Sequence, residues 1–454
     1  MAIITQPELA LWGKIEKTPE MLLLVIVLES MTDEDLMRKL EKDRKNGRND
    51  YPVRYMWNLQ MARIILGHPT LASFHRELMR NPTLIQLCGA PFRNNWYDAV
   101  PSLDALYNFR SKLAEFYVEE VEAIFHDLLG RGIELLTDLG EHLAVDSTAL
   151  DSAGRKVTDK TKQNIRDGRR DLDARFGKKT YISADGETIK IIKWFGYKLH
   201  IIMDTKYGVP VGFYVTPANA SDYKNLTPLV DQVEKYHPEI IERAEVLTAD
   251  RGYDSEENNG FLWKVHGIIP VIDKRKLWKN RKETRPLNED KVDSIVYDEQ
   301  GHLHCVCPVT GTQRNMAFQG FEKDRNTLKY RCPAAAYGLD CKGRKLCEKN
   351  ANIKSDFGRV VRVSAEGNTR RFSPVVHGSP KWERLYNERS AVERLNYRLK
   401  FLFHVGQRKL RGINNFRLDV AMSMAVLMTV FVARVEAKDV QNYRSLYEPL
   451  PIAA

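Results

Sequence analysis

Four side chains suited to chemistry recur at helical spacing near the C-terminal end of the sequence, namely Tyr386, Arg389, Glu393 and Lys400. At roughly 100° per residue, all four fall within about 60° of one another on a helix. A carboxylate flanked by two cations and a phenol suits a phosphodiester and a metal ion. The same residues also fit a solvated helix face on which Glu393 pairs with Arg389 or Arg394.

Two aspartates, Asp146 and Asp250, each end a short apolar run. We therefore expect each carboxylate at the C-terminal end of a strand, where ligands gather in open α/β sheets. With Glu393 they make three acids, whose pKa values rise unless a cation neutralises them. Oxygen ligands without histidine or cysteine favour Mg²⁺ or Mn²⁺, and two such ions can bridge a scissile phosphate. Taken singly, each aspartate also fits a turn or a helix N-cap.

The composition limits the possible partners and compartments. The 454-residue chain is long enough for two or three domains, and its 70 Lys and Arg against 60 Asp and Glu give a formal charge of +10. This modest basic excess favours a polyanionic partner such as nucleic acid. We expect no signal peptide and no membrane span, because the apolar run 420–433 is too short and should be a buried helix. Six unevenly placed cysteines indicate a reducing cytosol rather than a disulfide scaffold.

Residues 1–140 have the apolar periodicity of helices, and Ser102 is an expected N-cap. We interpret this region as a helical domain that binds DNA ends, although an ordinary helical bundle explains the pattern equally well. Helices are expected at 56–66 and 70–79, and the basic character comes from Arg63, Arg76, Arg80, Arg93 and Arg110.

From residue 141 onward, strand patterns indicate a mixed α/β core. The basic segment 155–179 is expected to be a loop near the active face. The strands are expected at 142–146, 196–204, 209–216, 244–250 and 267–272, with a helix at 226–236. The segments are the first part of the core at 141–273, an insertion subdomain at 274–378, helices carrying Glu393 at 379–435 and a tail at 436–454.

The segment from Tyr386 to Lys400 resembles the Tyr-Arg-Glu-Lys signature of bacterial insertion-sequence transposases of the DDE class. The residues around Asp146 and Asp250 are similar to that family's first and second aspartate motifs. The segments 196–200 and 215–222 resemble other parts of its core. Each motif alone is weakly specific, but the ordered set is a strong signal.

The resemblance implies an RNase H-like mixed-sheet catalytic core with an N-terminal helical domain and an inserted subdomain. It implies Asp146, Asp250 and Glu393 as ligands of two Mg²⁺ or Mn²⁺ ions, and no nucleotide cofactor. The implied activity is cleavage of the ends of an insertion element and their joining to target DNA, by metal-dependent hydrolysis and transesterification. The implied partners are double-stranded DNA, as inverted repeats and target, bound by a homodimer on paired ends in the bacterial cytoplasm.

Two other functions stay open at this point: a metal-dependent nuclease of the same fold without strand transfer, and an inactive DNA-binding derivative. Other aspartates could be the true ligands, namely Asp151, Asp204, Asp222 and Asp254.

Tyr386, Arg389 and Lys400 are the expected DNA-binding residues. At about 1.5 Å per residue, Lys400 lies roughly 10 Å along the helix from Glu393, so we expect it to hold a backbone phosphate near the cut. Arg389 should fork onto a phosphate beside the scissile bond, and Tyr386 should bond a phosphate or stack near the terminal base. Packing and ion-pair roles are the alternative for Tyr386 and Arg389.

Two further groups of residues have open roles. Trp194 and Trp382 could stack on a flipped base or could be core aromatics. Together with His302 and His304, the cysteines of the insertion offer enough soft ligands for a structural Zn²⁺, with free thiols as the alternative. These cysteines are Cys305, Cys307, Cys332, Cys341 and Cys347.

Overall fold

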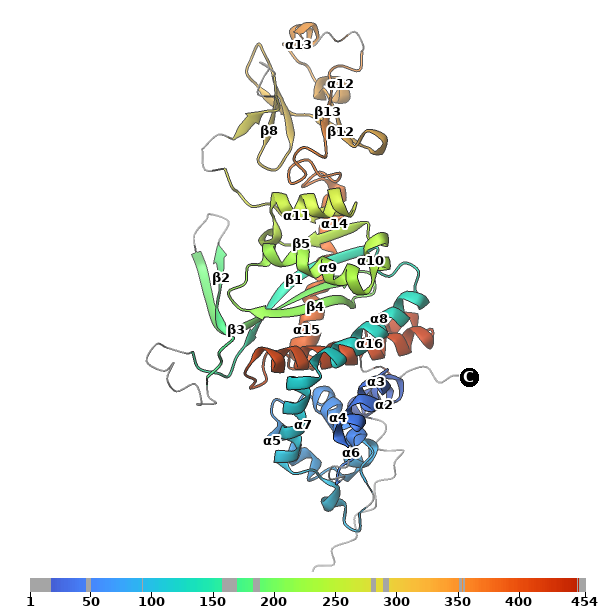
Figure 1. The fold of residues 1–454 in the computed structure, drawn as a ribbon. Coiled ribbons are helices and arrows are strands. Elements are labelled where there is room, and N and C mark those ends of the chain that lie inside the picture. Colours follow the sequence, from blue (N-terminus) through green and yellow to red (C-terminus); the bar gives the residue numbers. More distant parts are fainter. Residues whose placement is uncertain are drawn as a thin grey trace, which may run out of the picture.

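The computed structural model describes residues 18–45, 50–91, 93–156, 170–182, 188–278, 283–288, 294–350, 353, 356–446 and 448. Figure 1 shows an elongated arrangement, with the N-terminal helices at the bottom, the large sheet in the middle and the strands of the insertion at the top. Parts of the predicted basic segment 155–179 and of the predicted tail 436–454 lie outside the described residues.

The N-terminal region is helical, as its periodicity predicts. The expected helices at 56–66 and 70–79 are α4 and α5, and Ser102 caps α7 by accepting the Ala105 N–H at 3.2 Å. Buried residues of this region and of the sheet form one continuous apolar core. The elements are α2 (Pro19–Ser30), α3 (Glu34–Arg44), α4 (Val53–Ile65), α5 (Leu71–Leu78), α6 (Pro82–Leu87), η1 (Trp96–Ala99), α7 (Leu103–Phe116) and α8 (Val118–Leu135).

The mixed sheet follows, and β1 and β3 are longer than the apolar runs indicate, whereas β5 and β6 are shorter. β1 pairs antiparallel with β3 and parallel with β5, β5 pairs parallel with β6, and β3 also pairs antiparallel with β2 and β4. The expected loop at 155–179 is wrong at its end, because residues from Arg175 onward belong to β2. The strands are β1 (His142–Asp151), β2 (Arg175–Ile182), β3 (Thr188–Asp204), β4 (Pro210–Pro217), β5 (Val246–Ala249) and β6 (Ile269–Ile272).

Short helices connect these strands. The helix expected at 226–236 is confirmed as α9 (Leu226–Tyr236), which packs on β3 and β4. The others are η3 (Asp222–Asn225), α10 (Pro238–Arg243), η4 (Arg251–Tyr253), α11 (Glu256–Gly260) and η5 (Phe261–Val265).

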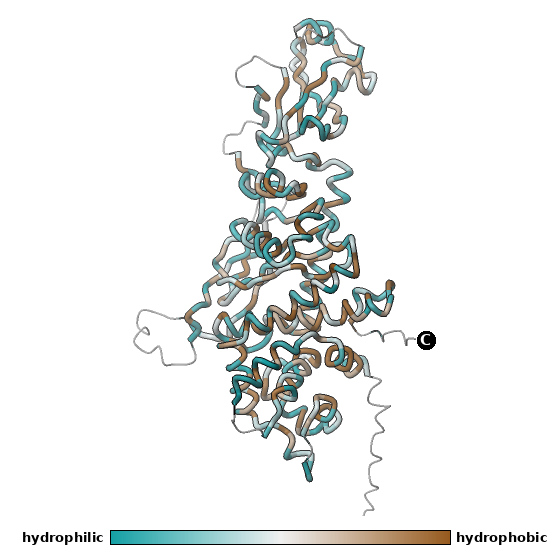
Figure 2. The backbone as a smooth tube through the Cα atoms, turned by 45° about the vertical axis from the view of Figure 1, so that its right-hand side comes forward, coloured by the Kyte–Doolittle hydropathy of each residue, from teal (hydrophilic) through white to brown (hydrophobic). Residues whose placement is uncertain are grey.

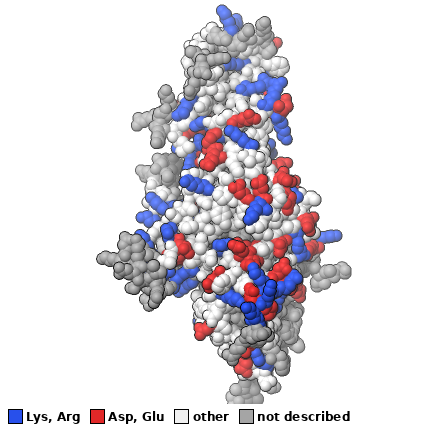
Figure 3. All heavy atoms as spheres, viewed as in Figure 1, with Lys and Arg blue, Asp and Glu red and all other residues white. Residues whose placement is uncertain are grey.

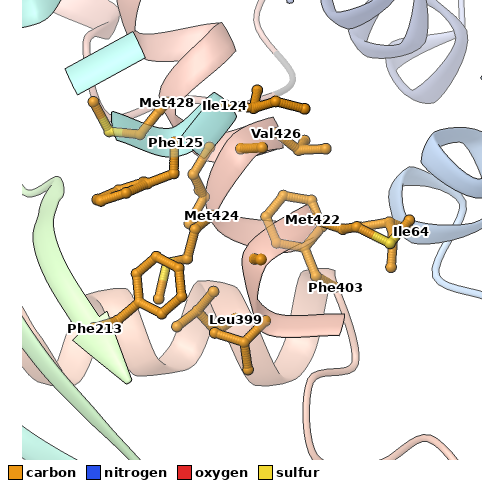
Figure 4. Close-up of a cluster of buried hydrophobic side chains, with 14 of the residues drawn as sticks. Ile64, Ile124, Phe125, Phe213, Leu399, Phe403, Met422, Met424, Val426 and Met428 are labelled. Carbon is orange, nitrogen blue, oxygen red and sulfur yellow. The ribbon is translucent and has the colours of Figure 1, made fainter. Parts of the chain in front are cut away.

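Helix α16 (Ile413–Glu436) is the central element of the core. It packs against α2, α4, α7, α8 and β4, and Figure 4 shows Met422 and Met424 among Ile64, Phe125 and Phe213 from three of these elements. In Figure 2, hydrophobic segments gather at this level, between the sheet and the N-terminal helices.

The apolar run 420–433 lies within α16. The expectation that this run is too short to span a membrane is wrong. It belongs to a helix of 24 residues, the one helix in the described part of the chain that is long and apolar enough to cross a membrane. Its whole apolar window is nevertheless buried inside the protein, which confirms the predicted buried helix. The short helix η8 (Val440–Asn442) follows it.

Two of the arginines assigned to a basic surface are buried instead. Arg63 and Arg110 each donate to Asp419 of α16, at 3.1 and 3.3 Å, and Arg408 donates to the same carboxylate at 2.6 Å. Arg63 and Arg110 therefore add no exposed positive charge to the helical region, because an acid distant in the sequence pairs with them in the core, and the binding of DNA ends by this region stays a prediction. Figure 3 shows basic and acidic side chains interspersed on the displayed face.

The insertion folds into two small antiparallel sheets, β10-β9-β8-β7 and β11-β12-β13. It has its own apolar cluster, which includes Ile295, Leu303 and Leu328. A buried ion pair between Asp254 and Arg370, at 2.6 Å, ties its end to the core. Its elements are β7 (Thr284–Pro286), β8 (Ile295–Asp298), β9 (Leu303–Val306), β10 (Gln313–Asn315), β11 (Ala317–Glu322), η6 (Lys323–Arg325), β12 (Thr327–Arg331), α12 (Pro333–Tyr337), α13 (Arg344–Asn350) and β13 (Val360–Ser364).

Candidate active site

Asp146 and Asp250 lie side by side in the sheet. The parallel pairing of β1 with β5 ends at Val145 and Ala249, so the next residue of each segment brings a carboxylate to the same place. Asp250 follows the end of β5, as expected. The expectation that Asp146 ends a strand is wrong, because β1 continues to Asp151 by pairing with β3.

Both carboxylates line one cavity of ≈ 380 Å³. Burial, and then the charge of Asp250, raises the pKa of Asp146 to about 6. The cavity therefore contains two acids that repel each other, and four lysines also line it. This arrangement suits a metal cation bound between the acids and an anion bound to the lysines. Its lining also includes Ser147, Trp194, Asp222, Lys178, Lys179, Lys198 and Lys400.

Asp222 is a third carboxylate of this cavity. One of its oxygens accepts the Ser147 hydroxyl at 2.8 Å and the Lys198 ammonium at 2.9 Å. A Cβ built on Gly252 would lie 2.7 Å from an oxygen of Asp250 and 3.4 Å from one of Asp222, so both acids approach the same glycine. From the sequence, we expected Asp222 only as an alternative ligand, and we did not predict a role for Lys198. The available signal was that both residues lie in segments that resemble the core of the family.

The segment from Tyr386 to Lys400 is not one continuous helix. Helix α14 (Pro380–Asn387) ends before Glu388, α15 (Ser390–Tyr397) begins after Arg389, and η7 (Arg398–Leu402) is a π-helical turn that contains Lys400. The predicted single helix is therefore interrupted at Glu388 and Arg389, although both residues keep right-handed helical dihedral angles. Glu388 holds the break in place, because its carboxylate accepts the Thr205 hydroxyl at 2.9 Å and lies 2.9 Å from His142 Nδ1.

Glu393 is paired with Arg389 and does not line the cavity that holds the two aspartates. Its carboxylate accepts the Arg389 guanidinium at 2.7 Å, its side chain is 60% exposed, and it is not among the described residues that line the cavity. Arg389 lies close enough to Asp146 for their charges to interact. The structure thus contains the ion pair that was the alternative for Glu393, and the assignment of Glu393 as a metal ligand stays a prediction.

Tyr386 is held between two other side chains. Its ring stacks on Trp382 at 4.5 Å and 13°, and the Arg389 guanidinium lies 5.6 Å from its centroid. Trp382 is only 8% exposed and packs in an apolar cluster, so it is a core aromatic. Trp194 lines the cavity, and a Cβ on Gly177 would lie 2.3 Å from its ring.

Lys400 lines the same cavity as Asp146. Burial lowers its pKa, with opposing effects from the acids Asp151 and Asp146 and a further lowering by Lys179. The five cysteines of the insertion line a different cavity of ≈ 290 Å³.

The comparisons with known proteins agree with this site. The transposase DDE domain model matches residues 138–429, a range that contains Asp146, Asp250 and Glu393. The putative transposase for insertion sequence element IS402 of Burkholderia cepacia is 41% identical over 86 residues, 18% of this chain and 39% of that protein. The transposase for insertion sequence element IS1106 of Neisseria meningitidis serogroup B is 28% identical over 198 residues, 41% of this chain and 61% of that protein.

The matched region thus spans less than two thirds of either relative. A cryo-EM structure of the piggyBac transposase synaptic complex with hairpin DNA is 12% identical with a TM-score of 0.38, over 95% of this chain and 80% of that one. A TM-score of that size supports no argument about function. The family model, in contrast, covers more than half of the chain, and this chain belongs to the transposase DDE domain family.

Proposed function

We propose that this chain is a DNA transposase that cleaves the ends of an insertion element and joins them to target DNA. The observation that carries the proposal is the meeting of Asp146 and Asp250 in a cavity ringed by lysines, inside the range that matches the transposase DDE domain. Two element ends need two such sites, so we propose a homodimer on paired ends, acting on DNA in the bacterial cytoplasm.

The strand order supports an RNase H-like catalytic core. Antiparallel β4, β3 and β1 are continued by parallel β5 and β6, and the segment with Glu393 returns to the sheet after the insertion, where α15 packs on β1. We keep the division into a helical region at 1–140, core segments at 141–273 and 379–435, an insertion at 274–378 and a tail at 436–454 as part of this proposal.

We propose that Asp146 and Asp250 bind two divalent ions, Mg²⁺ or Mn²⁺. The residues fit such ions, because they offer hard oxygen donors whose mutual repulsion a cation relieves. Glu393 would complete the ligand set once its carboxylate leaves Arg389, and Asp222 already faces the cavity. When bound, the ions supply positive charge for the attacking and leaving oxygens of the phosphodiester.

The cations around the acids are the proposed phosphate contacts. Lys400 faces the cavity and would neutralise a phosphate next to the scissile one. A DNA phosphate competes with Glu393 for the Arg389 guanidinium, so DNA binding itself would free Glu393. Because the Tyr386 ring already stacks on Trp382 and lies beside the Arg389 guanidinium, we propose that Tyr386 orients Arg389 and contacts phosphate through its hydroxyl rather than stacking on a base.

The activity can be tested on a supercoiled plasmid that carries the flanking inverted repeats of the element. With Mg²⁺, the full chain should cut at the ends and yield joined products. Asp250→Ala should abolish both products and should leave retardation of end DNA in gels unchanged. Cuts without joined DNA would favour the nuclease alternative, and binding without cuts would favour an inactive derivative. Either result would overturn the proposal.

The affinity for a divalent ion should depend on pH. Because the pKa of Asp146 is raised to about 6, an ion must displace a proton from it at lower pH. We expect the Mn²⁺ affinity to rise by about tenfold per pH unit up to about pH 6 and to level off above it. Titration calorimetry measures this directly, and Asp146→Asn should remove the slope. A constant affinity between pH 5 and 8 would contradict the assignment.

A further inference from the structure

Five cysteines that are distant in the sequence meet in the insertion. Cys305 lies on β9 and Cys307 just beyond it, Cys332 precedes α12, and Cys341 and Cys347 lie before and on α13. All five line the cavity of ≈ 290 Å³, and none forms a disulfide. The cavity therefore joins three separate segments of the insertion through sulfur atoms.

Cys307 lies in a turn that surrounds its sulfur with donors. The Thr310 side chain and the backbone N–H groups of Thr310, Val309 and Gly343 surround it. The turn is closed by the Gly311 N–H, which donates to the Cys307 carbonyl at 2.8 Å. A Cβ on Gly343 would lie 2.6 Å from the Cys307 sulfur, so only glycine allows this approach. Amide donors around a sulfur are the surroundings that a metal-bound thiolate needs.

The other two segments converge on the same place. Cys341 interacts with the side chain of Cys307 and with the Gly343 backbone. The Cys347 N–H donates to the Gly343 carbonyl at 2.9 Å, and the Cys332 N–H donates to the Arg359 carbonyl at 2.8 Å. Backbone hydrogen bonds thus hold the chain in place at Cys347 and at Cys332.

The segment that carries these thiols has almost no apolar core. Among the described residues 332–348, only Pro333, Ala334 and Gly343 are buried. Tyr337 is 64% exposed and Leu346 43%. Helices of five and seven residues are not stable without a partner, so some other interaction must hold α12 and α13 against the strands.

Cys305 is the one of the five cysteines that also packs against the apolar cluster of the insertion, which includes Ile295, Leu303 and Met316. Its sulfur lies close enough to Cys332, Cys341 and Cys347 for their charges to interact. A tetrahedral site takes four thiols, and we assign Cys305 to packing because it alone of the five has this apolar contact.

We propose that Cys307, Cys332, Cys341 and Cys347 bind one structural zinc ion that fastens α12 and α13 to the strands of the insertion. No three of the described sulfurs lie within 4.8 Å of one another, so binding must draw the thiols together across the cavity. The residues belong to no part of the proposed catalytic site, and the zinc site stands whether or not the chain cleaves DNA.

The metal content of the full chain tests this proposal. Protein purified from zinc-supplemented medium without chelators should hold one zinc per chain by plasma mass spectrometry. Cys332→Ser and Cys347→Ser should each lose it, whereas Cys305→Ser and Cys88→Ser should keep it. Cys88 is buried in the N-terminal helices and serves as the matched control. Zinc lost from Cys305→Ser, or kept in both ligand variants, would overturn the assignment.

Two measurements on the unaltered chain guard against variants that fail to fold. Replacement of zinc by Co²⁺ should give the visible absorption and sulfur-to-metal charge-transfer bands of a tetrahedral thiolate site. Chelation should then make the segment 332–350 the first site of proteolysis. A chain without zinc, without Co²⁺ bands, or with a disulfide between Cys307 and Cys341 would contradict the proposal.

Discussion

Asp146→Asn should abolish DNA cleavage and also make the metal-free protein more stable. Cleavage should fall by on the order of 10³-fold or more, because loss of a metal ligand removes several kcal/mol of transition-state stabilisation. Stability should rise because the folded protein keeps a carboxylate whose pKa burial and Asp250 raise to about 6. An amide of the same shape carries no charge and avoids the repulsion.

The gain in stability should depend on pH in a defined direction. The folded pKa of Asp146, about 6, lies above its ordinary value of 3.8, so the folded state binds the proton more tightly. The contribution of Asp146 is fully present below about pH 4 and is lost as the pH rises through 6. Asp146→Asn should therefore raise the free energy of unfolding by about 1–2 kcal/mol at pH 8 and by little at pH 4.

Thermal melts of the metal-free proteins at the two pH values measure this effect. Added Mg²⁺ should narrow the difference, because it stabilises the unaltered chain alone. Asp324→Asn is the control, since Asp324 is exposed on the insertion, and it should change neither the melting temperature nor cleavage. A variant that cleaves DNA, or that melts below the unaltered chain at pH 8, would contradict the role given to Asp146.

The helices and strands could be predicted from the sequence more accurately than the positions of the functional side chains. The helix α9 and the strand before Asp250 follow from local periodicity and hydrophobicity. The continuation of β1 past Asp146 has no local signal, because it depends on pairing with β3, a strand about fifty residues further on. The acids nevertheless meet as expected, since the parallel register with β5 is what aligns them.

The break before α15 is a second feature that periodicity could not predict. Charge spacing from Tyr386 to Lys400 fits an uninterrupted helix, yet Glu388 is bound by His142 at the start of β1 and by Thr205 just after β3. This tertiary contact directs Arg389 toward Asp146 and lets a π-helical turn bring Lys400 into the cavity. The spacing therefore identified Arg389 and Lys400 as residues near the acids, but it predicted one uninterrupted helix where the structure has a break and a π-helical turn.

Asp419→Asn should destabilise the whole protein more than any substitution in the active site. Asp419 is the one carboxylate bonded to Arg63, Arg110 and Arg408, and all four side chains are at most 6% exposed. Without its charge, three guanidiniums stay buried without compensation, which typically costs about 3–5 kcal/mol. Denaturant unfolding should show this loss as a lower midpoint.

The arginines of this cluster should contribute less to stability individually than the carboxylate that they share. Arg63→Met should cost less than Asp419→Asn, because it removes one of three like charges that crowd a single carboxylate and leaves an apolar side chain in an apolar core. Glu122→Gln on α8 is the matched control, since it breaks the part-exposed pair with Arg417 of α16 and should cost less than about 1 kcal/mol. If Asp419→Asn were as mild as this control, the cluster would not be what joins α4 and α7 to α16. Arginines on an exposed DNA-binding surface would tolerate the loss of a neighbouring carboxylate. A large loss of stability in Asp419→Asn would therefore also show that Arg63 and Arg110 are buried and do not contact DNA.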